Sequence, residues 1–169
     1  DTPFYKGWNG FLNDERLAAL LEKYDKKLLF FPHRRMQKYL GEFSAASERI
    51  KFADAGNYDI QDVLKSAALM ITDYSSVFFD FAYMRKPVIF YQFDEKEFRE
   101  RQYKKGYLDY HDTVLGEWTG TNDELIAALE RKLEGGIKEI PEETVKEFFP
   151  LWDERNCERI FEAITGRNK

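Results

Sequence analysis

Two serines and an acid follow directly after an apolar run, where residues 68–76 read ALMITDYSS. If a helix begins at Ser75 and Ser76, their hydroxyls, the free backbone N–H groups and the helix dipole would together favour a bound anion. Thr72 and Asp73 belong to the same turn. The alternative role is helix capping, for which Asp and Ser are common residues. The turn lacks the glycines of a P-loop or a dinucleotide motif, which argues against a Walker-type nucleotide site.

A histidine and two arginines follow a second apolar run, in KLLFFPHRR at residues 27–35. His33 can act as a general base or donate to a phosphate, because an imidazole titrates near neutrality. Arg34 and Arg35 can neutralise phosphate charge. A single loop histidine is more often only solvated or packed. Two loops contain groups that can bind phosphate, one with hydroxyls and N–H groups and the other with His and Arg. Together they favour a phosphorylated ligand.

Other chemically active residues give weaker signals. Residues 92–110 hold cations that are candidates to close over a phosphate, although charge runs are usually solvated: Arg99, Arg101, Lys104 and Lys105. His111 lies between Asp109 and Asp112, but one histidine among scattered acids is weak support for a metal, and no metal site is expected. Cys157 falls in an amphipathic pattern and is predicted to pack.

Short apolar segments alternate with helical patterns along the chain and must position these residues. Strands are predicted at 26–31, 49–53, 68–72 and 87–91. Helices are predicted at 14–24 with Asn13 as the cap, 34–43, 58–67 with Asp59 as the cap, 75–84, 122–133, 141–149 and 154–164. This alternation predicts an α/β domain with a Rossmann-like parallel sheet flanked by helices. Ligands of such sheets bind beyond the carboxyl ends of the strands, where both loops would lie.

Composition limits the classes of function. The 169 residues suit a single domain, and a net charge of −5 argues against bulk nucleic-acid binding. One cysteine permits no internal disulfide, which fits a reducing cytosol. No signal peptide or membrane-spanning run is apparent. The first residues read as a loop and do not begin with Met, so we expect a piece of a longer protein.

Four segments, in order, closely resemble the CDP-glycerol glycerophosphotransferase family of wall teichoic acid synthesis: PHRRMQKYL, YDIQDVLKSAALMITDYSSVFFDFAYMRKPVIFYQFD, KGYLDY and NCERIFEAI. The resemblance runs from about residue 8 to 164. It implies that residues 1–169 form the C-terminal, nucleotide-donor-binding lobe of a two-lobed GT-B fold. It also implies transfer of polyol phosphate from CDP-glycerol, or a related CDP-polyol, to a polyol-phosphate acceptor, with release of CMP and without an organic cofactor.

By resemblance, His33 matches the family's essential histidine, and Ser75 and Ser76 match the turn that holds the donor phosphates. Asp73 and Asp80 match the acids that flank this turn. Thr72 and Arg34 are further substrate-binding candidates, with Arg35 and His111 as weaker ones. The residues after KGYLDY read HDTVLGEW and depart from the family pattern, which weakens the case for His111.

The resemblance also sets expectations for partners and location. A second histidine of the family lies in the N-terminal lobe, which this chain lacks, so the isolated lobe is expected to transfer little. The full-length protein would work in the cytoplasm at the inner face of the bacterial membrane, and would make any membrane contact. Two other functions stay open: a nucleotide-sugar-dependent GT-B glycosyltransferase lobe, and a non-catalytic module that docks to a membrane or a partner.

Overall fold

The strands of this protein are short and run parallel to their hydrogen-bonded neighbours. The computed structural model describes residues 2–101 and 108–166. Strand β1 (Leu28–Phe30) pairs with β2 (Ile50–Phe52), and β4 (Val88–Tyr91) lies between β3 (Met70–Thr72) and β5 (Gly116–Thr119). The predicted α/β class with parallel strands is confirmed. The strands form two sheets, of two and three strands, where the sequence pattern predicts one.

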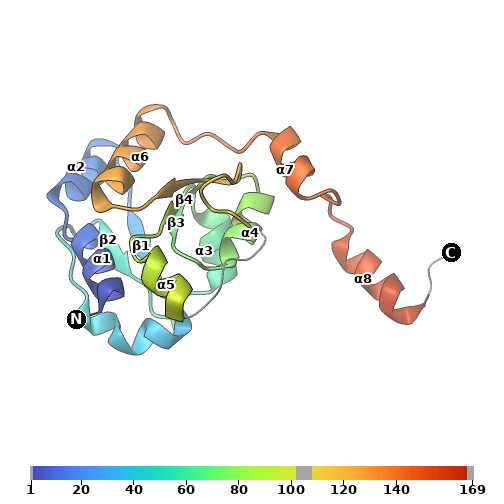
Figure 1. Cartoon of the computed structure of the whole chain (residues 1–169), viewed down its shortest axis with the longest axis horizontal. Coiled ribbons are helices and arrows are strands. Elements are labelled where there is room, and N and C mark those ends of the chain that lie inside the picture. Colours follow the sequence, from blue (N-terminus) through green and yellow to red (C-terminus); the bar gives the residue numbers. More distant parts are fainter. Residues whose placement is uncertain (1, 102–107, 167–169) are drawn as a thin grey trace.

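Helices cover the strands from two sides (Figure 1). On one side lie α1 (Pro3–Leu12), α2 (Glu15–Lys23) and α6 (Asn122–Glu134), whose apolar faces share a core with β1 and β4. On the other lie α3 (Ile60–Ser66) and α4 (Val77–Tyr83). Phe78 and Phe81 of α4 are fully buried against Val88 and Phe90 of β4. This burial fixes the start of α4, and with it the turn that follows β3.

The first residues form helix α1, although the sequence there reads as a loop. Two glycines obscured the helical pattern, and one of them has a packing reason: a Cβ at Gly7 would collide with the ring of Phe93. The predicted cap of α2 was also wrong by one residue. Asp14 accepts the Arg16 N–H at 2.8 Å, whereas Asn13 ends α1 by donating from its side chain to the carbonyl of Asn9.

Three further elements depart from the predicted pattern. The segment after the PH motif is a 3₁₀ helix, η1 (Arg34–Glu42), and β5 and the short helix α5 (Glu95–Arg101) were not predicted. Helix α4 lies within the range predicted for it, 75–84, and Arg85, two residues after its end, adopts a left-handed conformation with φ of 62°. The predicted helices α3, with its Asp59 cap, and α6 are confirmed.

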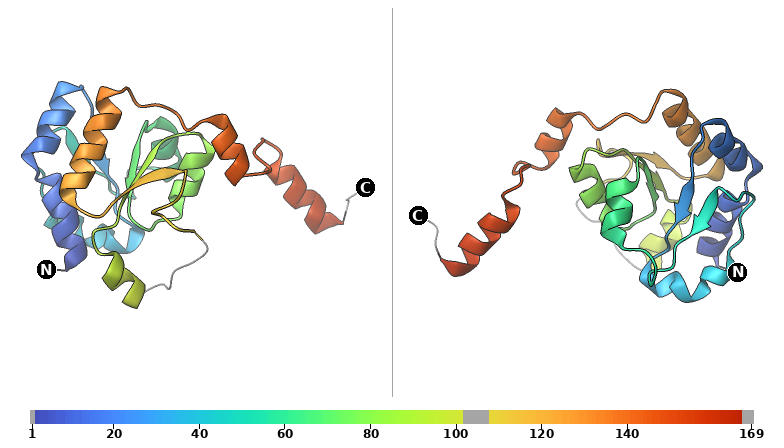
Figure 2. Two further views of the ribbon diagram at one scale, coloured as in Figure 1. Left: turned by 45° about the horizontal axis from the view of Figure 1, so that its top comes forward. Right: turned by 180° about the vertical axis from the view of Figure 1, so that it is seen from behind.

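The C-terminal residues form an arm that extends from the body (Figures 1 and 2). Helix α7 (Glu142–Phe148) packs on α4, where Phe79 contacts the rings of Phe148 and Phe149. Helix α8 (Asn156–Thr165) has no buried residue, and Cys157 is exposed, so its predicted packing role is wrong. None of the described helices combines the length and apolarity needed to cross a lipid bilayer.

Candidate functional site

The turn between β3 and α4 consists of Asp73–Ser76 and is called the serine turn below. Its shape is set by Asp73, whose carboxylate accepts the N–H of Tyr74 at 2.7 Å and also bonds the backbone of Ser75. Thr72, the last residue of β3, is buried and contributes to the strand end. Asp73 and strand β3 therefore hold the turn in place. The serine side chains are not needed for this and can contact a ligand.

The serines do not cap α4, contrary to the alternative that the sequence left open. Ser76 occupies the N-cap position with helical dihedrals and makes no side-chain cap bond. Within residues 2–101 and 108–166, neither serine hydroxyl has a hydrogen-bond partner, and the N–H groups of Ser76 and Val77 have none either. Ser75 is half-buried and Ser76 is exposed. Two hydroxyls and two N–H groups are thus available to an anion.

The PH loop that follows β1 lies close to the serine turn. Burial raises the pKa of the Asp73 carboxyl, while backbone N–H groups and, more weakly, the charge of His33 act in the opposite direction. The effect of His33 on Asp73 places the PH loop within electrostatic range of the serine turn. The two loops that the sequence singled out therefore lie near each other.

His33 is exposed, and one of its ring nitrogens is engaged by the chain. Its Nδ1 accepts the backbone N–H of Arg35 at 3.2 Å, which makes His33 the cap of η1. In a neutral imidazole one nitrogen accepts and the other carries the proton, so this contact assigns the proton to Nε2. Nε2–H, which has no hydrogen-bond partner among the described residues, is then a donor. This geometry favours contact with a phosphate over service as a general base.

A buried glutamine that sequence reasoning missed supports the serine turn. Gln92, only 2% exposed, donates from Nε2 to the Asp73 carbonyl at 2.9 Å. Its Oε1 accepts the indole N–H of Trp118 at 3.1 Å. No local sequence pattern predicts that Gln92 supports the turn, because this role depends on β4 lying between β3 and β5.

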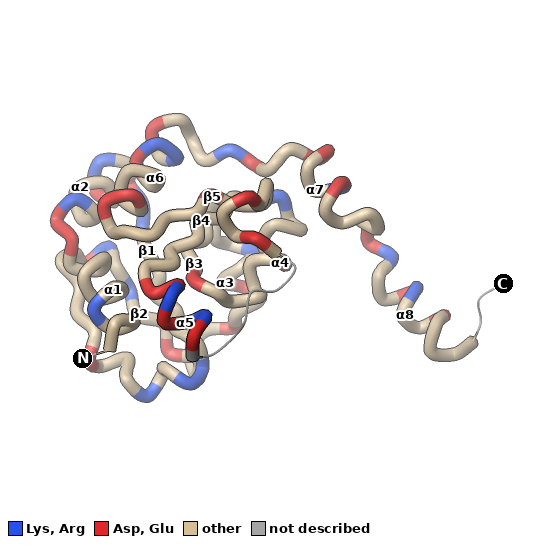
Figure 3. The backbone as a smooth tube through the Cα atoms, in the orientation of Figure 1, with Lys and Arg blue, Asp and Glu red and all other residues tan. Residues whose placement is uncertain are grey.

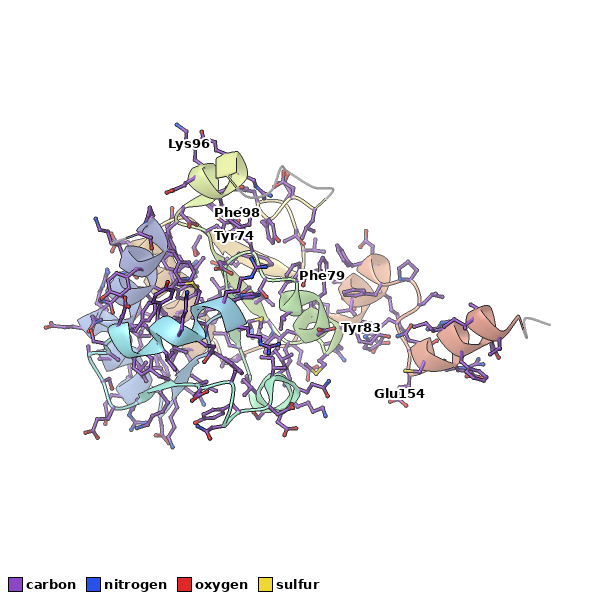
Figure 4. All side chains as sticks on the ribbon, turned by 90° about the horizontal axis from the view of Figure 1, so that it is seen from below. Tyr74, Phe79, Tyr83, Lys96, Phe98 and Glu154 are labelled. Carbon is purple, nitrogen blue, oxygen red and sulfur yellow. The ribbon has the colours of Figure 1, made fainter. Side chains whose placement is uncertain are left out.

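The ring of Tyr74 ties helix α5 to the serine turn. Its hydroxyl donates to Asp94 at 3.0 Å, and its ring stacks on Phe98 with the centroids 3.6 Å apart. Figure 4 shows Tyr74 and Phe98 side by side, with Lys96 on the far side of α5. Burial raises the pKa of Asp94 and, with the charge of Asp94, that of Tyr74. The neutral phenol is thereby kept as a donor.

Several predicted residues lie outside this constellation. Asp80 is exposed on α4. His111 is exposed, with Nε2 2.9 Å from Glu95 Oε2 and its ring against Trp118, so it contacts the α5 segment and not the serine turn. Arg99 pairs with Glu95. Lys104, Lys105 and the side chain of Arg101 lie outside the described residues, within which no metal-binding cluster of His, Cys, Asp and Glu occurs.

Comparison with protein families gives one match over nearly the whole chain. A model described as CDP-Glycerol:Poly(glycerophosphate) glycerophosphotransferase matches residues 4–166. The minor teichoic acid biosynthesis protein GgaB of Bacillus subtilis (strain 168) is 34% identical over 97% of this chain and 18% of GgaB. The teichoic acid ribitol-phosphate polymerase TarL of Staphylococcus aureus (strain NCTC 8325 / PS 47) is 31% identical over 97% of this chain and 27% of TarL.

Solved structures agree on the fold. The wall teichoic acid polymerase TagF superposes with a TM-score of 0.53 at 18% identity, over 90% of this chain and 47% of that chain. A structure of TagF from a CDPG soak also matches, with a TM-score of 0.51. This chain therefore spans about half of the TagF chain and less than a third of the length of GgaB and TarL.

Proposed function

Because the chain belongs to the CDP-glycerol:poly(glycerophosphate) glycerophosphotransferase family, we propose that it is the lobe of such an enzyme that holds the phosphates of a CDP-polyol donor. One observation carries the proposal. The Ser75 and Ser76 hydroxyls, with no partner among the described residues, lie at the carboxyl ends of the strands near the exposed His33, whose Nε2 also has no hydrogen-bond partner among those residues.

The proposed reaction is attack by a hydroxyl of a polyol-phosphate acceptor on the β-phosphorus of the donor. The new P–O bond forms as the bond to the CMP oxygen breaks, CMP leaves with the bonding electron pair, and the acceptor hydroxyl loses its proton. Negative charge on the phosphates must be matched throughout. The serine turn and His33 Nε2–H supply neutral donors, and Arg34 at the start of η1 supplies a positive charge.

The remaining parts of the site belong to the rest of the polypeptide in this proposal. A second lobe would supply the group that accepts the hydroxyl proton and would close over the donor. Residues 1–169 act as a single donor-binding domain, with Asp73 shaping its turn. We propose the cytoplasmic, membrane-peripheral location that the resemblance implies.

Calorimetric titration of the full-length protein with CDP-glycerol, CDP-ribitol, CMP and UDP-glucose tests this proposal. Ser75→Ala and Ser76→Ala should each weaken binding of a CDP-polyol by about tenfold or more, since a hydrogen bond to a charged group contributes about 1.5–3 kcal/mol. Ser66→Ala is the matched control, because that hydroxyl bonds only the Val63 carbonyl at the end of α3.

Two results would contradict the proposal. Unchanged CDP-polyol affinity in both serine variants would remove the serine turn from the site. Binding of UDP-glucose alone would move the protein to nucleotide-sugar glycosyl transfer, the second function that the sequence leaves open.

A further inference from the structure

The arginines beside His33 differ from the others in one respect. Every other arginine whose side chain the structure describes pairs with a carboxylate: Arg16, Arg49, Arg85, Arg99, Arg131, Arg155 and Arg159. Arg34 and Arg35 are exposed and have no acidic partner among the described residues. Lys38, four residues after Arg34, also has none, and its ammonium lies over the ring of Tyr39.

These cations form a basic stretch on an acidic protein. Residues 31–41 contain three cations and a histidine but no acid, although the whole chain carries a net charge of −5. In Figure 3 the cations of η1 are the blue segments of the tube at the lower edge of the molecule. A guanidinium without a carboxylate partner is a ready phosphate ligand, because its planar donors match phosphate oxygens.

The 3₁₀ geometry of η1 aligns two of the cations. With three residues per turn, Arg35 and Lys38 fall on one side of the helix, about 6 Å apart along its axis. Both are exposed. Gln37 and Leu40 follow Arg34 at the same three-residue spacing, and both face the protein. Gln37 bonds the Pro32 carbonyl, and Leu40 packs on the core. Arg35 and Lys38 therefore present a separate, outward row.

We propose that Arg35 and Lys38 bind the phosphodiester backbone of the polymeric acceptor, next to the site where the new unit is added. This inference rests on the proposed function, in which the acceptor is a polyol-phosphate chain. Two charges set apart along a helix suit a chain whose phosphates are separated by polyol units. The adjacent phosphates of the donor are bound by the serine turn, His33 and Arg34, so Arg35, a weaker donor candidate in the sequence, is assigned to the acceptor instead.

The test compares two ligands on the full-length protein: CDP-glycerol and a short synthetic oligo(glycerol phosphate). The double variant Arg35→Gln/Lys38→Gln should weaken oligomer binding by about tenfold or more and reduce the salt dependence of that binding. Its affinity for CDP-glycerol should stay within about twofold of the wild type. Lys26→Gln/Lys27→Gln is the matched control, since it removes the same charge from two exposed residues just before β1, at the opposite end of that strand from η1.

The outcomes separate this inference from the proposed function. Oligomer binding that is absent in the wild type or unchanged in the Arg35/Lys38 variant overturns the inference, whatever the donor does. Loss of CDP-glycerol binding in that variant assigns both residues to the donor and also overturns it. Equal competition by single-stranded DNA would show unspecific polyanion binding and overturn the polyol-phosphate assignment. A wild type that binds the oligomer but no CDP-polyol contradicts the proposed function alone.

Discussion

Replacing Gln92 with leucine tests whether the serine turn depends on a buried amide. The side chain is 2% exposed and makes two hydrogen bonds, to the Asp73 carbonyl and from the Trp118 indole N–H. Leucine fills a similar volume but leaves both partners unsatisfied. Each polar group that is left buried and unsatisfied costs about 1–3 kcal/mol, so Gln92→Leu should lower the free energy of unfolding by about 2–6 kcal/mol.

Gln37→Leu is the matched control for this prediction. Gln37 also makes two backbone contacts, to the Pro32 carbonyl and from the Ala55 N–H, but it is only half-buried. Water can replace its hydrogen bonds, so the expected loss is about 1 kcal/mol or less. Urea denaturation of both variants, followed by circular dichroism, gives the two free energies. Equal losses in the two variants, or a loss below about 1 kcal/mol for Gln92→Leu, would refute the reasoning.

Three further predictions follow from the same geometry. His33→Gln, whose amide can place a donor near the position of Nε2, should keep much of the transfer activity that His33→Ala loses; equal inactivity in steady-state assays would instead favour the general-base role. Asp73→Asn should be more stable than the wild type at neutral pH, because burial raises the pKa of Asp73 above its ordinary 3.8 and the charged carboxylate lowers the stability of the wild type. The difference should shrink as the pH falls through the raised pKa and vanish well below pH 3.8, where the carboxyl is protonated in both the folded and the unfolded state. Denaturation across this pH range checks the sign, and lower stability of the variant at neutral pH would contradict it. Tyr83→Phe should speed hydrogen exchange in α8 but not in α6, because the Tyr83 hydroxyl accepts bonds from the Asp153 N–H and the Asn156 amide. Unchanged exchange in α8 would show that this contact does not hold the arm.

The parallel α/β class could be predicted because local signals agree with the fold. The apolar runs around Leu28–Phe30 and Met70–Thr72, the Asp59 cap and the amphipathic pattern of α6 each specify their element within a few residues. Strand β5 escaped prediction because Gly116 and Glu117 weaken its apolar pattern, and its place depends on pairing with β4.

The candidate site was predicted in part, for a comparable reason. His33, Ser75 and Ser76 stand out because each follows a strand end, and the rule for ligand position in parallel sheets applies to them directly. Gln92, Tyr74 and the tautomer of His33 depend on contacts between segments far apart in the chain or on the local 3₁₀ turn. Chemical type alone could not reveal these roles.

The position of the donor phosphates is the most direct test of the central claim. A structure of the full-length protein bound to CDP-glycerol would show it. The account predicts the diphosphate within hydrogen-bonding distance of the Ser75 and Ser76 hydroxyls and of His33 Nε2. A diphosphate bound elsewhere, with the serine turn and His33 still facing solvent, would contradict it.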